Sequence, residues 1–420
     1  MIYKYPLTKK QTIEIMKDHP SPFHIYDEAQ IRENARKLYK AFSWAPGFKN
    51  YFAVKANPNP FILKILKEEG MGADCSSLPE LMLAEKAGIL KEDIMFTSND
   101  TPANEFIKAK ELGAVINLDD IGHIESLENS AGIPKLICFR FNPGPAKTGN
   151  AFIGDPKEAK YGLTKEQLFA AYSMMKERGV ERFGLHTMIA SNELNGDYHV
   201  ETARMLFELV VEIKQKLGIV IEFINLGGGY GIPAKPDEEP VDLEYVSSKI
   251  KKLYDELIIA NGIDGLKIVM ESGRMIMGPY GWLISSVRHM KHTYKDYVGL
   301  NSCMADLMRP ALYDAYHHIT VLDKEDAKLD HKYDVTGSLC ENNDKFAIDR
   351  MLPKIEERDI VVIHNTGAHG HAMGFNYNGK LRSSELLLRE DGSVVEIRRA
   401  ETTDDYFATL DFKELDKFKV

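Results

Sequence analysis

The sequence is poor in cysteine and has no long apolar run. Its 420 residues include four cysteines and no CxxC pair; they are Cys75, Cys138, Cys303 and Cys340. So few cysteines do not make a disulfide scaffold, which fits a reducing compartment. No apolar stretch approaches the roughly 18 residues of a membrane span, and the start, MIYKYP, lacks the apolar core of a signal peptide. We therefore expect a cytoplasmic protein that does not enter a membrane.

Blocks of basic residues are also missing. Lys and Arg number 53 and Asp and Glu 63, which gives a net charge of −10. An acidic chain without a basic block is a poor partner for nucleic acid or an anionic membrane surface. The composition, 44% hydrophobic and 28% charged, is ordinary for a soluble globular protein. The length suits two or three domains.

Strands and helices alternate in the first two thirds of the chain. From about residue 26, short apolar runs rich in β-formers are separated by charged segments of helical period, such as 60–69, 78–87 and 104–112. The eight runs are 51–56, 72–76, 94–98, 114–118, 136–142, 183–189, 223–226 and 267–271. This alternation predicts βαβ units with a parallel sheet. Eight units in roughly 250 residues match a (β/α)₈ TIM-like barrel; an open doubly wound sheet is the alternative.

The pattern changes after about residue 280. Helical periods fade, and short alternating runs occur at 281–287, 293–298, 333–336, 360–364, 385–388 and 394–398. Such runs are typical of an antiparallel β domain. We therefore expect a barrel over 26–280 and a C-terminal β-sandwich or β-barrel-like domain over 281–420. Residues 1–25 belong to no barrel unit, and we expect them to join the second domain.

A lysine interrupts the first predicted barrel strand. Residues 51–57 read YFAVKAN, with Lys55 among apolar neighbours. Burying an ammonium group is costly unless it is paired or neutralised. Desolvation lowers the pKa of a lysine, and a lysine tuned in this way can form a Schiff base. A lysine that reaches solvent from the end of the barrel explains the residue as well, so Lys55 alone decides nothing.

Glycines and charged residues follow the last two predicted barrel strands, where phosphate often binds in this fold. Three glycines at 227–229 would let backbone N–H groups approach a phosphate, although a tight turn explains them equally well. The last strand runs into ESGR, residues 271–274. Glu271 can accept a hydrogen bond from a protonated ring nitrogen, and Arg274 can hold a carboxylate or phosphate. A structural Glu–Arg ion pair is the alternative.

The strand predicted over 183–189 continues into HTMIAS, residues 186–191. A period of two places His186, Met188 and Ala190 on one face, which should point into the barrel. Ser191, just past the strand, could donate to a phosphate. A lone inward histidine is more often a core residue with satisfied hydrogen bonds, so His186 by itself indicates no function.

Two clusters of reactive side chains lie in the predicted β domain. Arg309 and Tyr313, four residues apart in RPALY, suit an anionic substrate group. In CENND, residues 340–344, Cys340 is followed by Glu341 and Asp344. A cysteine near two acids suits proton transfer. Either cluster on its own is also consistent with a purely structural role.

These motifs occur in one order along the chain, and that order is similar to a known family. YFAVKAN, HTMIAS, NLGGGYG, ESGR, RPALY, CENND and, after GAHG, NYN at 376–378 resemble the fold type III decarboxylases, which use pyridoxal 5'-phosphate (PLP) on the alanine-racemase fold. Within that family the motifs look most like those of the diaminopimelate decarboxylases. The resemblance covers nearly the whole chain, and seven motifs in order are a strong signal.

The resemblance implies a role for each candidate residue. Lys55 would hold PLP covalently, Glu271 would keep the pyridine nitrogen protonated, and Cys340, reaching in from a second subunit, would return a proton to the substrate. Further contacts to PLP would come from Ser191, Gly228, Gly229, Gly273, Arg274 and His369. Substrate contacts would come from Arg274, Arg309, Tyr313, Glu341, His369 and Tyr377. No metal is implied.

The resemblance also implies a reaction. A homodimer with shared active sites would convert meso-2,6-diaminopimelate to L-lysine and CO₂, the last step of lysine biosynthesis, with the protonated ring as electron acceptor. The alternative is decarboxylation of another diamino acid: ornithine, D-lysine or carboxynorspermidine. Arg309 and Tyr313 together with Glu341 favour a small amino-acid substrate whose distal end carries both a carboxylate and an ammonium group.

The chain departs from the family pattern in three places. The strand-six motif of the family has a second histidine and a glycine, where this chain has Met188 and Ala190. A methionine can pack on an aromatic face, but it cannot carry a proton. His369 replaces a tyrosine, and two asparagines at 342–343 replace a small Ser-Gly step. These departures bear on the substrate more than on the cofactor.

Two other classes of function are less favoured by the sequence. His364, His369 and His371 suggest a metal-dependent hydrolase, since histidine is the commonest metal ligand. None of the three follows a predicted barrel strand, however, and no carboxylate stands among them at ligand spacing. A non-catalytic PLP-binding protein is the other possibility, and the ordered motifs of the second domain argue against it.

Overall fold

The computed structural model describes residues 4–147 and 155–418. These residues form two compact units. The first unit comprises residues 29–233 and 237–278. The second combines the described residues of Met1–Glu28 and Pro279–Val420 with Ala234–Pro236. In the part of the chain that the structure describes, no helix is long and apolar enough to cross a membrane.

The first unit is a closed barrel of eight parallel strands, so the predicted (β/α)₈ fold is confirmed. The strands are β2 (Lys49–Ala53), β3 (Gly72–Cys75), β4 (Ile94–Ser98), β5 (Val115–Leu118), β6 (Leu136–Arg140), β7 (Arg182–His186), β8 (Ile221–Asn225) and β9 (Lys267–Met270). Pairing of β2 with β9, Lys49 opposite Val269, closes the ring. The open doubly wound alternative is therefore wrong.

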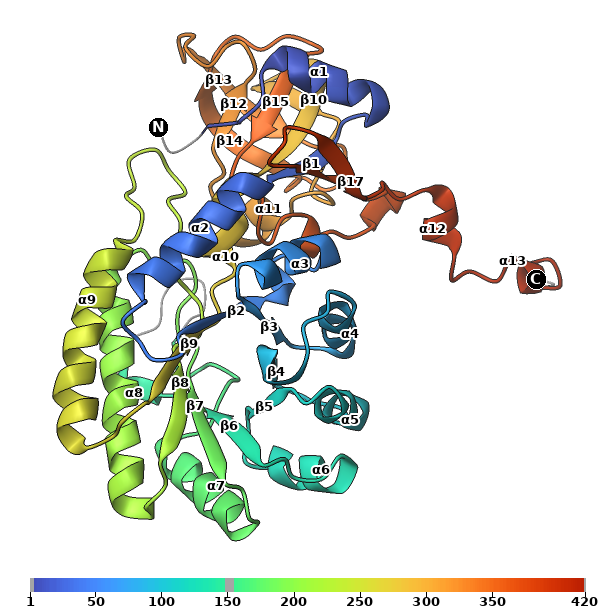
Figure 1. Cartoon of the computed structure of the whole chain (residues 1–420). Helices are drawn as coiled ribbons and strands as arrows, with labels where there is room; N and C mark the ends of the chain where they lie inside the picture. The colour runs from blue at the N-terminus through green and yellow to red at the C-terminus, as the bar shows by residue number, and fades with distance from the viewer. Residues whose placement is uncertain (1–3, 148–154, 419–420) are drawn as a thin grey trace. The chain divides into compact units, whose positions relative to one another are not determined.

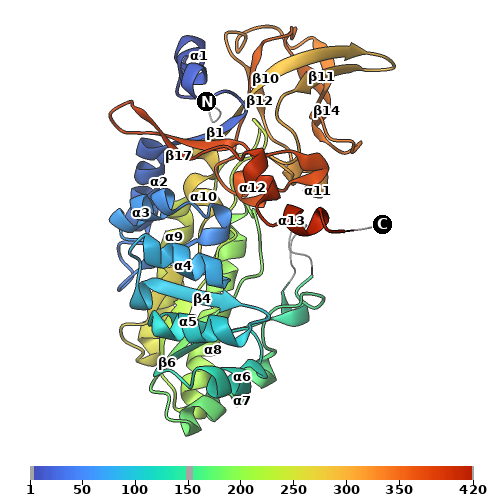
Figure 2. The ribbon, with the colours of Figure 1, turned by 90° about the vertical axis from the view of Figure 1, so that its right-hand side faces the viewer.

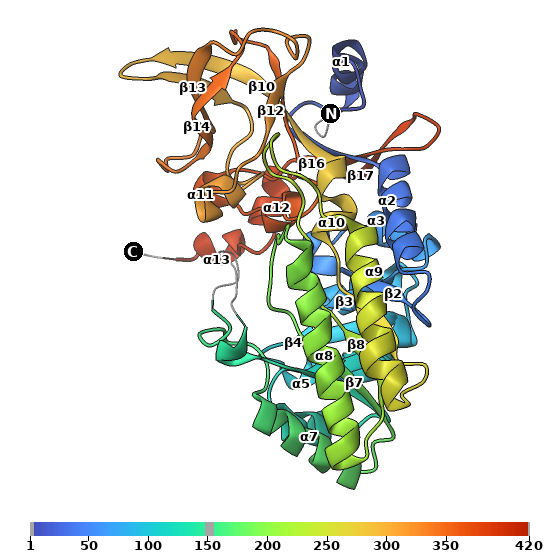
Figure 3. The ribbon, with the colours of Figure 1, turned by 90° about the vertical axis from the view of Figure 1, so that its left-hand side faces the viewer.

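Helices surround the barrel strands (Figure 1). They are α2 (Glu28–Ala41), α3 (Pro60–Glu68), α4 (Leu78–Lys86), α5 (Ala103–Glu111), α6 (His123–Ser130), α7 (Lys165–Glu177), α8 (Gly196–Leu217), α9 (Leu243–Leu253) and the short α10 (Arg274–Met277). The helical segments predicted at 60–69, 78–87 and 104–112 are confirmed. Figure 3 shows α8 and α9 side by side. Asn59 begins α3 by accepting from the Phe61 N–H, with Pro60 in the first turn, a favoured start for a helix.

Apolar side chains fill the middle of the barrel. The buried cluster contains residues from six strands: Tyr51, Met95, Val115, Leu136, Cys138, Phe223 and Val269. Gly184 makes room for this packing, since a Cβ there would lie 2.1 Å from the Phe223 ring. Polar residues such as Asn117, His186 and Asn225 stand at or near the carboxyl ends of their strands. The chemistry of the barrel is therefore concentrated at that end, as the fold predicts.

The second unit is a mostly antiparallel sheet of nine strands, which confirms a C-terminal β domain beside the barrel fold. The strands are β1 (Phe23–Asp27), β10 (Gly281–His292), β11 (Asp296–Leu300), β12 (Ile319–Val321), β13 (His331–Thr336), β14 (Lys345–Leu352), β15 (Ile360–Ile363), β16 (Ser384–Leu388) and β17 (Val394–Arg398). Its helices are α1 (Lys9–Asp18), α11 (Arg309–Tyr313), α12 (Thr403–Phe407) and α13 (Phe412–Leu415). Figure 2 shows β10 and β11 as a long hairpin.

Three strands of this sheet were not predicted. β1 lies in the N-terminal segment and pairs with both β10 and β16, the latter in parallel. β11 and β13 form a second parallel pair. β12 has three residues, too few for a visible alternation, and β14 has no regular alternation of buried and exposed side chains. Pairing across the sheet, rather than local pattern, therefore creates these strands.

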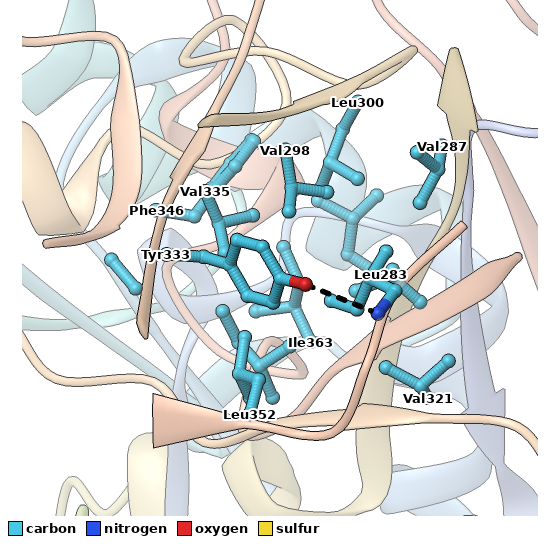
Figure 4. Close-up of a cluster of buried hydrophobic side chains, with 14 of the residues drawn as sticks. Leu283, Val287, Val298, Leu300, Val321, Tyr333, Val335, Phe346, Leu352 and Ile363 are labelled. Atoms are coloured by element: carbon cyan, nitrogen blue, oxygen red, sulfur yellow. Dashed lines mark hydrogen bonds between the residues drawn. The ribbon is translucent and has the colours of Figure 1, made fainter. Parts of the chain in front are cut away.

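The core of the second unit packs between its strands. Figure 4 shows Leu283, Val298, Val335 and other buried aliphatic side chains around Tyr333. Tyr333 is 4% exposed, and its hydroxyl accepts a hydrogen bond from the Ile355 N–H at 3.4 Å. This contact ties the loop after β14 to the core.

A buried carboxylate stabilises the same unit. Glu385 on β16 is 2% exposed and accepts a hydrogen bond from the Tyr26 hydroxyl at 2.6 Å. Arg398 on β17 donates to its other oxygen, and His371 Nδ1 lies 3.6 Å away. Burial raises the pKa of Glu385, but the charges of His371 and Arg398 and the Tyr26 hydrogen bond outweigh burial and lower the pKa to about 2.

We predict that Glu385→Gln removes part of the pH dependence of stability. A carboxyl whose pKa falls from 4.5 to about 2 on folding stabilises the protein above pH 4.5, and this contribution is lost as pH falls towards 2. The shift corresponds to about 3 kcal/mol. Urea unfolding from pH 7 downward should show the variant less stable at pH 7 and less sensitive to acid than the wild type. Glu325→Gln, an exposed carboxylate of the same unit, is the control. An unchanged acid slope in Glu385→Gln would contradict this role.

Candidate active site

A buried carboxylate stands at the carboxyl end of the barrel. Glu271 directly follows β9 and is 7% exposed. Asn225, the last residue of β8, donates from Nδ2 to Glu271 Oε1 at 2.7 Å, and His186 Nε2 at the end of β7 lies 3.3 Å from Oε2. Burial raises the pKa of Glu271, but the attraction of His186 and Arg140 and the hydrogen bonds outweigh burial and hold the pKa below its usual value. Glu271 is therefore ionised at neutral pH.

A chain of hydrogen bonds orients the imidazole beside Glu271. His186 Nδ1 lies 2.6 Å from Asn117 Nδ2. This contact fixes the orientation of the ring, so that Nε2 faces Glu271. Asn117 also donates to Thr97 Oγ1 at 3.1 Å. The chain thus links β4, β5 and β7 to the carboxylate after β9.

Lys55 lies just beyond β2, not inside a strand. The strand ends at Ala53, and Val54–Ala56 form a 3₁₀ turn. Val54 and Ala56 are buried in this turn, whereas the Lys55 side chain is exposed. The expectation of a strand through residue 56 is therefore wrong, and of the two interpretations of Lys55 the exposed side chain agrees with a lysine that reaches solvent. The turn places the amine at the end of the barrel with its aliphatic stem free to reach over it.

The charge of Lys55 affects the pKa of two acidic side chains near the end of the barrel. Asp74 on β3 is 8% exposed; burial and the charge of Glu271 raise its pKa well above the usual value, and Lys55 partly offsets this. Burial likewise raises the pKa of Glu80 on α4, while hydrogen bonds from Ser76 and the charge of Lys55 oppose it. The sequence analysis singled out neither acid, although Asp74 in GADC is a polar residue in a buried run.

The segment after β7 is a loop. β7 ends at His186, so Met188 and Ala190 do not continue its face as expected. Thr187 still contacts the segments on either side, donating from its N–H to Asn225 O and from Oγ1 to Phe141 O, and the loop begins after it. Ser191 therefore lies in a loop at the carboxyl end of the barrel, beyond its predicted strand.

The glycine run after β8 packs against this loop. Gly227 donates to Asn225 Oδ1 at 2.9 Å, and Gly228 donates to the Met188 thioether at 3.2 Å. Gly229 has a φ of +89°, and a Cβ there would lie 2.5 Å from Ala190 O. Its carbonyl accepts from the Glu193 N–H at 2.8 Å. Glycine is therefore needed for the close approach of the two loops, which brings the Ser191 loop beside Gly228 and Gly229.

The loop after β9 is held by an asparagine that the sequence analysis missed. Asn50 on β2 accepts from the Ser272 N–H at 2.8 Å and donates to the Ser272 carbonyl at 3.0 Å. Gly273 follows, where a Cβ would lie 2.8 Å from the Ala56 Cβ. The start of α10, with Arg274 as its first residue, therefore lies against the turn that carries Lys55.

The second unit holds Arg309 and Tyr313 on one turn of helix. Both belong to α11, and the Arg309 guanidinium carbon lies 5.7 Å from the centre of the Tyr313 ring. Arg309 is 6% exposed, and burial lowers its pKa. Tyr313 is 46% exposed. The pair thus presents a buried guanidinium beside an accessible phenol, a combination suited to an anion.

Cys340 and Glu341 are carried by a loop fixed on Asp344. That carboxylate is 4% exposed and accepts from the Met304 and Leu339 N–H groups at 2.7 and 2.8 Å. The Cys340 thiol is exposed, and its N–H donates to Asn378 Oδ1 at 2.7 Å. This bond brings the cysteine loop beside the NYN segment with Tyr377, which is 54% exposed.

The histidines considered as metal ligands have other partners. His364 accepts from Trp282 Nε1 at 3.2 Å and its Nε2 pairs with Thr320 Oγ1 at 2.9 Å. His371 Nε2 lies 2.9 Å from Ser383 O, and its Nδ1 accepts from Arg382. His369, half-buried with a φ of +57°, stands in the loop after β15. Both ring nitrogens of the two buried histidines are thus committed within the β domain.

The family comparison identifies the barrel. A family model described as "Pyridoxal-dependent decarboxylase, pyridoxal binding domain" matches residues 28–278. The chain belongs to this family. The predicted resemblance to the fold type III PLP decarboxylases is confirmed, and with it the cofactor, PLP, and the enzyme class, a carboxy-lyase.

Relatives of this decarboxylase span nearly its whole length. Protein TabA of Pseudomonas amygdali pv. tabaci is 42% identical over 405 residues, 96% of this chain and 94% of TabA. The diaminopimelate decarboxylase of Methanothermobacter thermautotrophicus is 34% identical over 396 residues, 94% and 92% of the two chains. The crystal structure of the M. jannaschii diaminopimelate decarboxylase in complex with L-lysine matches with a TM-score of 0.87 and 31% identity, over 95% of this chain and 94% of that one.

The donor and acceptor groups at the barrel end fit PLP. Glu271 offers an ionised carboxylate for a protonated ring nitrogen, and Lys55 offers an amine for the aldehyde. The Gly228 N–H donates to a thioether, which is a weak acceptor that a phosphate oxygen would replace. Ser191, Gly229, Gly273 and Arg274 add donors in the adjoining loops. The decarboxylase would hold PLP between these groups.

We predict that Glu271→Gln uncouples cofactor binding from catalysis. The amide keeps the size of the side chain but loses the charge that favours a protonated ring. Removal of one preorganised electrostatic partner costs on the order of 10²–10³ in rate. CO₂ release should fall by about that factor, while titration with PLP shows binding retained. Glu177→Gln, an exposed carboxylate on α7, is the control. A variant as active as wild type would remove Glu271 from this role.

Proposed function

We propose that this PLP-dependent decarboxylase converts meso-2,6-diaminopimelate to L-lysine and CO₂. The observation that carries the proposal is the ionised Glu271, held beneath the barrel end by Asn225 and His186. An electron-accepting cofactor is what cleavage of a bond to an α-carboxylate requires. The names of several full-length relatives, and a structural relative in complex with L-lysine, support this choice of substrate and product.

The roles of the residues follow from their chemistry. When bound, PLP supplies an electron sink for the pair left behind as the carboxylate departs. Glu271 would keep the ring nitrogen of the bound cofactor protonated. Lys55 would hold PLP by bonding its aldehyde through the side-chain amine. Each role follows from a contact or charge described for the barrel.

Residues of the second unit would recognise the distal end of the substrate. The buried Arg309 guanidinium and the Tyr313 hydroxyl suit its carboxylate. Glu341 suits its ammonium group. Diaminopimelate presents both charges at that end, whereas ornithine and D-lysine present only the ammonium group. We propose Cys340 as the donor of the proton to the α-carbon, supplied by the partner in a homodimer with shared sites.

A second candidate substrate class has its own support. TabA is 42% identical to this chain, more than the 34% of the Methanothermobacter diaminopimelate decarboxylase, and its name states no reaction. Met188 and His369 stand where the family pattern has histidine and tyrosine. Both observations support keeping the alternative of another diamino acid, such as ornithine, D-lysine or carboxynorspermidine. The cofactor chemistry would be unchanged.

The substrate is tested by a panel of amino acids. CO₂ release should be fastest from meso-diaminopimelate and at least about tenfold slower from L- and D-lysine and L- and D-ornithine, because a distal carboxylate binds through a charge-assisted hydrogen bond worth about 1.5–3 kcal/mol. Arg309→Lys should raise KM for diaminopimelate more than for lysine. Equal rates on lysine and diaminopimelate would contradict the proposal and favour the alternative.

Shared sites are tested by mixing two inactive variants. Lys55→Ala should lose the absorbance of bound PLP, because the aldehyde has no amine to bond. Cys340→Ala should keep that absorbance but turn over slowly, by a factor on the order of 10²–10⁴ for a lost proton donor. Mixing the two should restore part of the activity if each site draws residues from two subunits. Cys340→Ser, which keeps a weak donor, is the milder control. The absence of recovery would argue against a shared site.

A further inference from the structure

An aromatic stack lies beneath the two loops that meet at the barrel end. His199, in the first turn of α8, packs on Tyr230 with ring centres 3.8 Å apart and an angle of 7° between the planes. Tyr230 directly follows the glycines at 227–229. His199 is 5% exposed and Tyr230 2%. The stack therefore joins the start of α8 to the glycine loop inside the protein.

The histidine also binds the other loop. His199 Nε2 lies 3.2 Å from the carbonyl oxygen of Glu193, and the same oxygen accepts from the Gly231 N–H at 2.9 Å. The Glu193 N–H in turn donates to Gly229 O at 2.8 Å. Glu193 and Tyr230 form a parallel bridge between the loops. The His199 imidazole therefore contacts both loops. One of these loops carries Ser191, and the other carries Gly228.

The ring of Tyr230, not its hydroxyl, makes this contact. Among the residues that the structure describes, the buried hydroxyl has no hydrogen-bond partner. His199 is neutral near pH 7, because burial lowers its pKa to about 4. A neutral imidazole can donate from Nε2 to Glu193 and still stack on the phenol ring. This stacking geometry requires an aromatic side chain at positions 199 and 230.

We propose that His199 is a positioning residue for the phosphate of PLP: by stacking on Tyr230 and binding Glu193, it sets the spacing between the Ser191 loop and the glycine loop. The inference rests on the proposed assignment of Ser191, Gly228 and Gly229 to the phosphate. His199 does not touch the phosphate. Loss of the stack lets the loops separate, so that their donors no longer converge on one anion.

The test compares PLP with pyridoxal, which has the aldehyde but no phosphate. The apoenzyme is titrated with each compound by absorbance, and the thermal midpoint of each variant is measured. An aromatic stack is worth about 0.5–1.5 kcal/mol, so His199→Ala and Tyr230→Leu should weaken PLP binding up to roughly tenfold. Pyridoxal binding, which depends on Lys55, should stay within a factor of about two, since it makes no phosphate contact.

Matched variants separate positioning from stability. Tyr230→Phe keeps the ring and should keep the PLP affinity. His199→Phe keeps the stack but loses the hydrogen bond to Glu193, so its PLP affinity should lie between those of the wild type and His199→Ala. Trp44→Ala removes an aromatic contact with Tyr254 and a hydrogen bond to Ser247 before β2, at the other end of the barrel. It should lower the thermal midpoint without changing the ratio of the PLP and pyridoxal affinities.

The outcomes are distinct. Parallel loss of PLP and pyridoxal binding in His199→Ala and Tyr230→Leu, or no loss of PLP binding in either, would overturn the positioning role. A wild-type enzyme that binds PLP no better than pyridoxal would overturn both this role and the phosphate assignment. A wild-type enzyme that prefers PLP but releases no CO₂ from meso-diaminopimelate would contradict only the proposed substrate.

Discussion

The site depends on keeping one carboxylate charged inside a barrel. Desolvation of an ion costs several kcal/mol and favours its neutral form. Glu271 overcomes this cost through the Asn225 amide, the neighbouring His186 and the positive charge of Arg140. Asp74 is also buried, but there burial and the charge of Glu271 outweigh the charge of Lys55 and raise the pKa. The pKa values of two carboxyl groups at one end of the barrel are therefore shifted in opposite directions.

Three buried asparagines fix the positions of the site residues at the end of the barrel. Asn50 on β2 holds the Ser272 backbone, Asn117 on β5 orients His186, and Asn225 on β8 binds both Glu271 and the Gly227 N–H. Each amide spans neighbouring strands or loops that are distant in sequence. Since buried polar groups must be paired, these amides specify one arrangement of the strand ends. The hydrogen bonds that place Glu271 therefore connect strands that closure of the barrel brings together.

The sequence predicted the barrel because parallel strands buried on both faces read as short apolar runs. It could not predict how each strand ends. Lys55 follows an unbroken run of β-forming residues, so nothing local marks the end of β2. The 3₁₀ turn around Lys55 packs against Gly273, a residue far along the chain. The end of β7 at His186 likewise depends on its neighbours. β1 could not be predicted for the same reason, because it depends on pairing with β10 and β16, which lie far along the chain.

The most direct test is the protonation state of the cofactor ring. PLP labelled with ¹⁵N at the pyridine nitrogen can be bound to the enzyme and followed by NMR between pH 6 and 9, with Glu271→Gln for comparison. The account predicts a protonated ring nitrogen throughout this range in the wild type and an unprotonated one in the variant. An unprotonated nitrogen in the wild-type enzyme at pH 7 would contradict it.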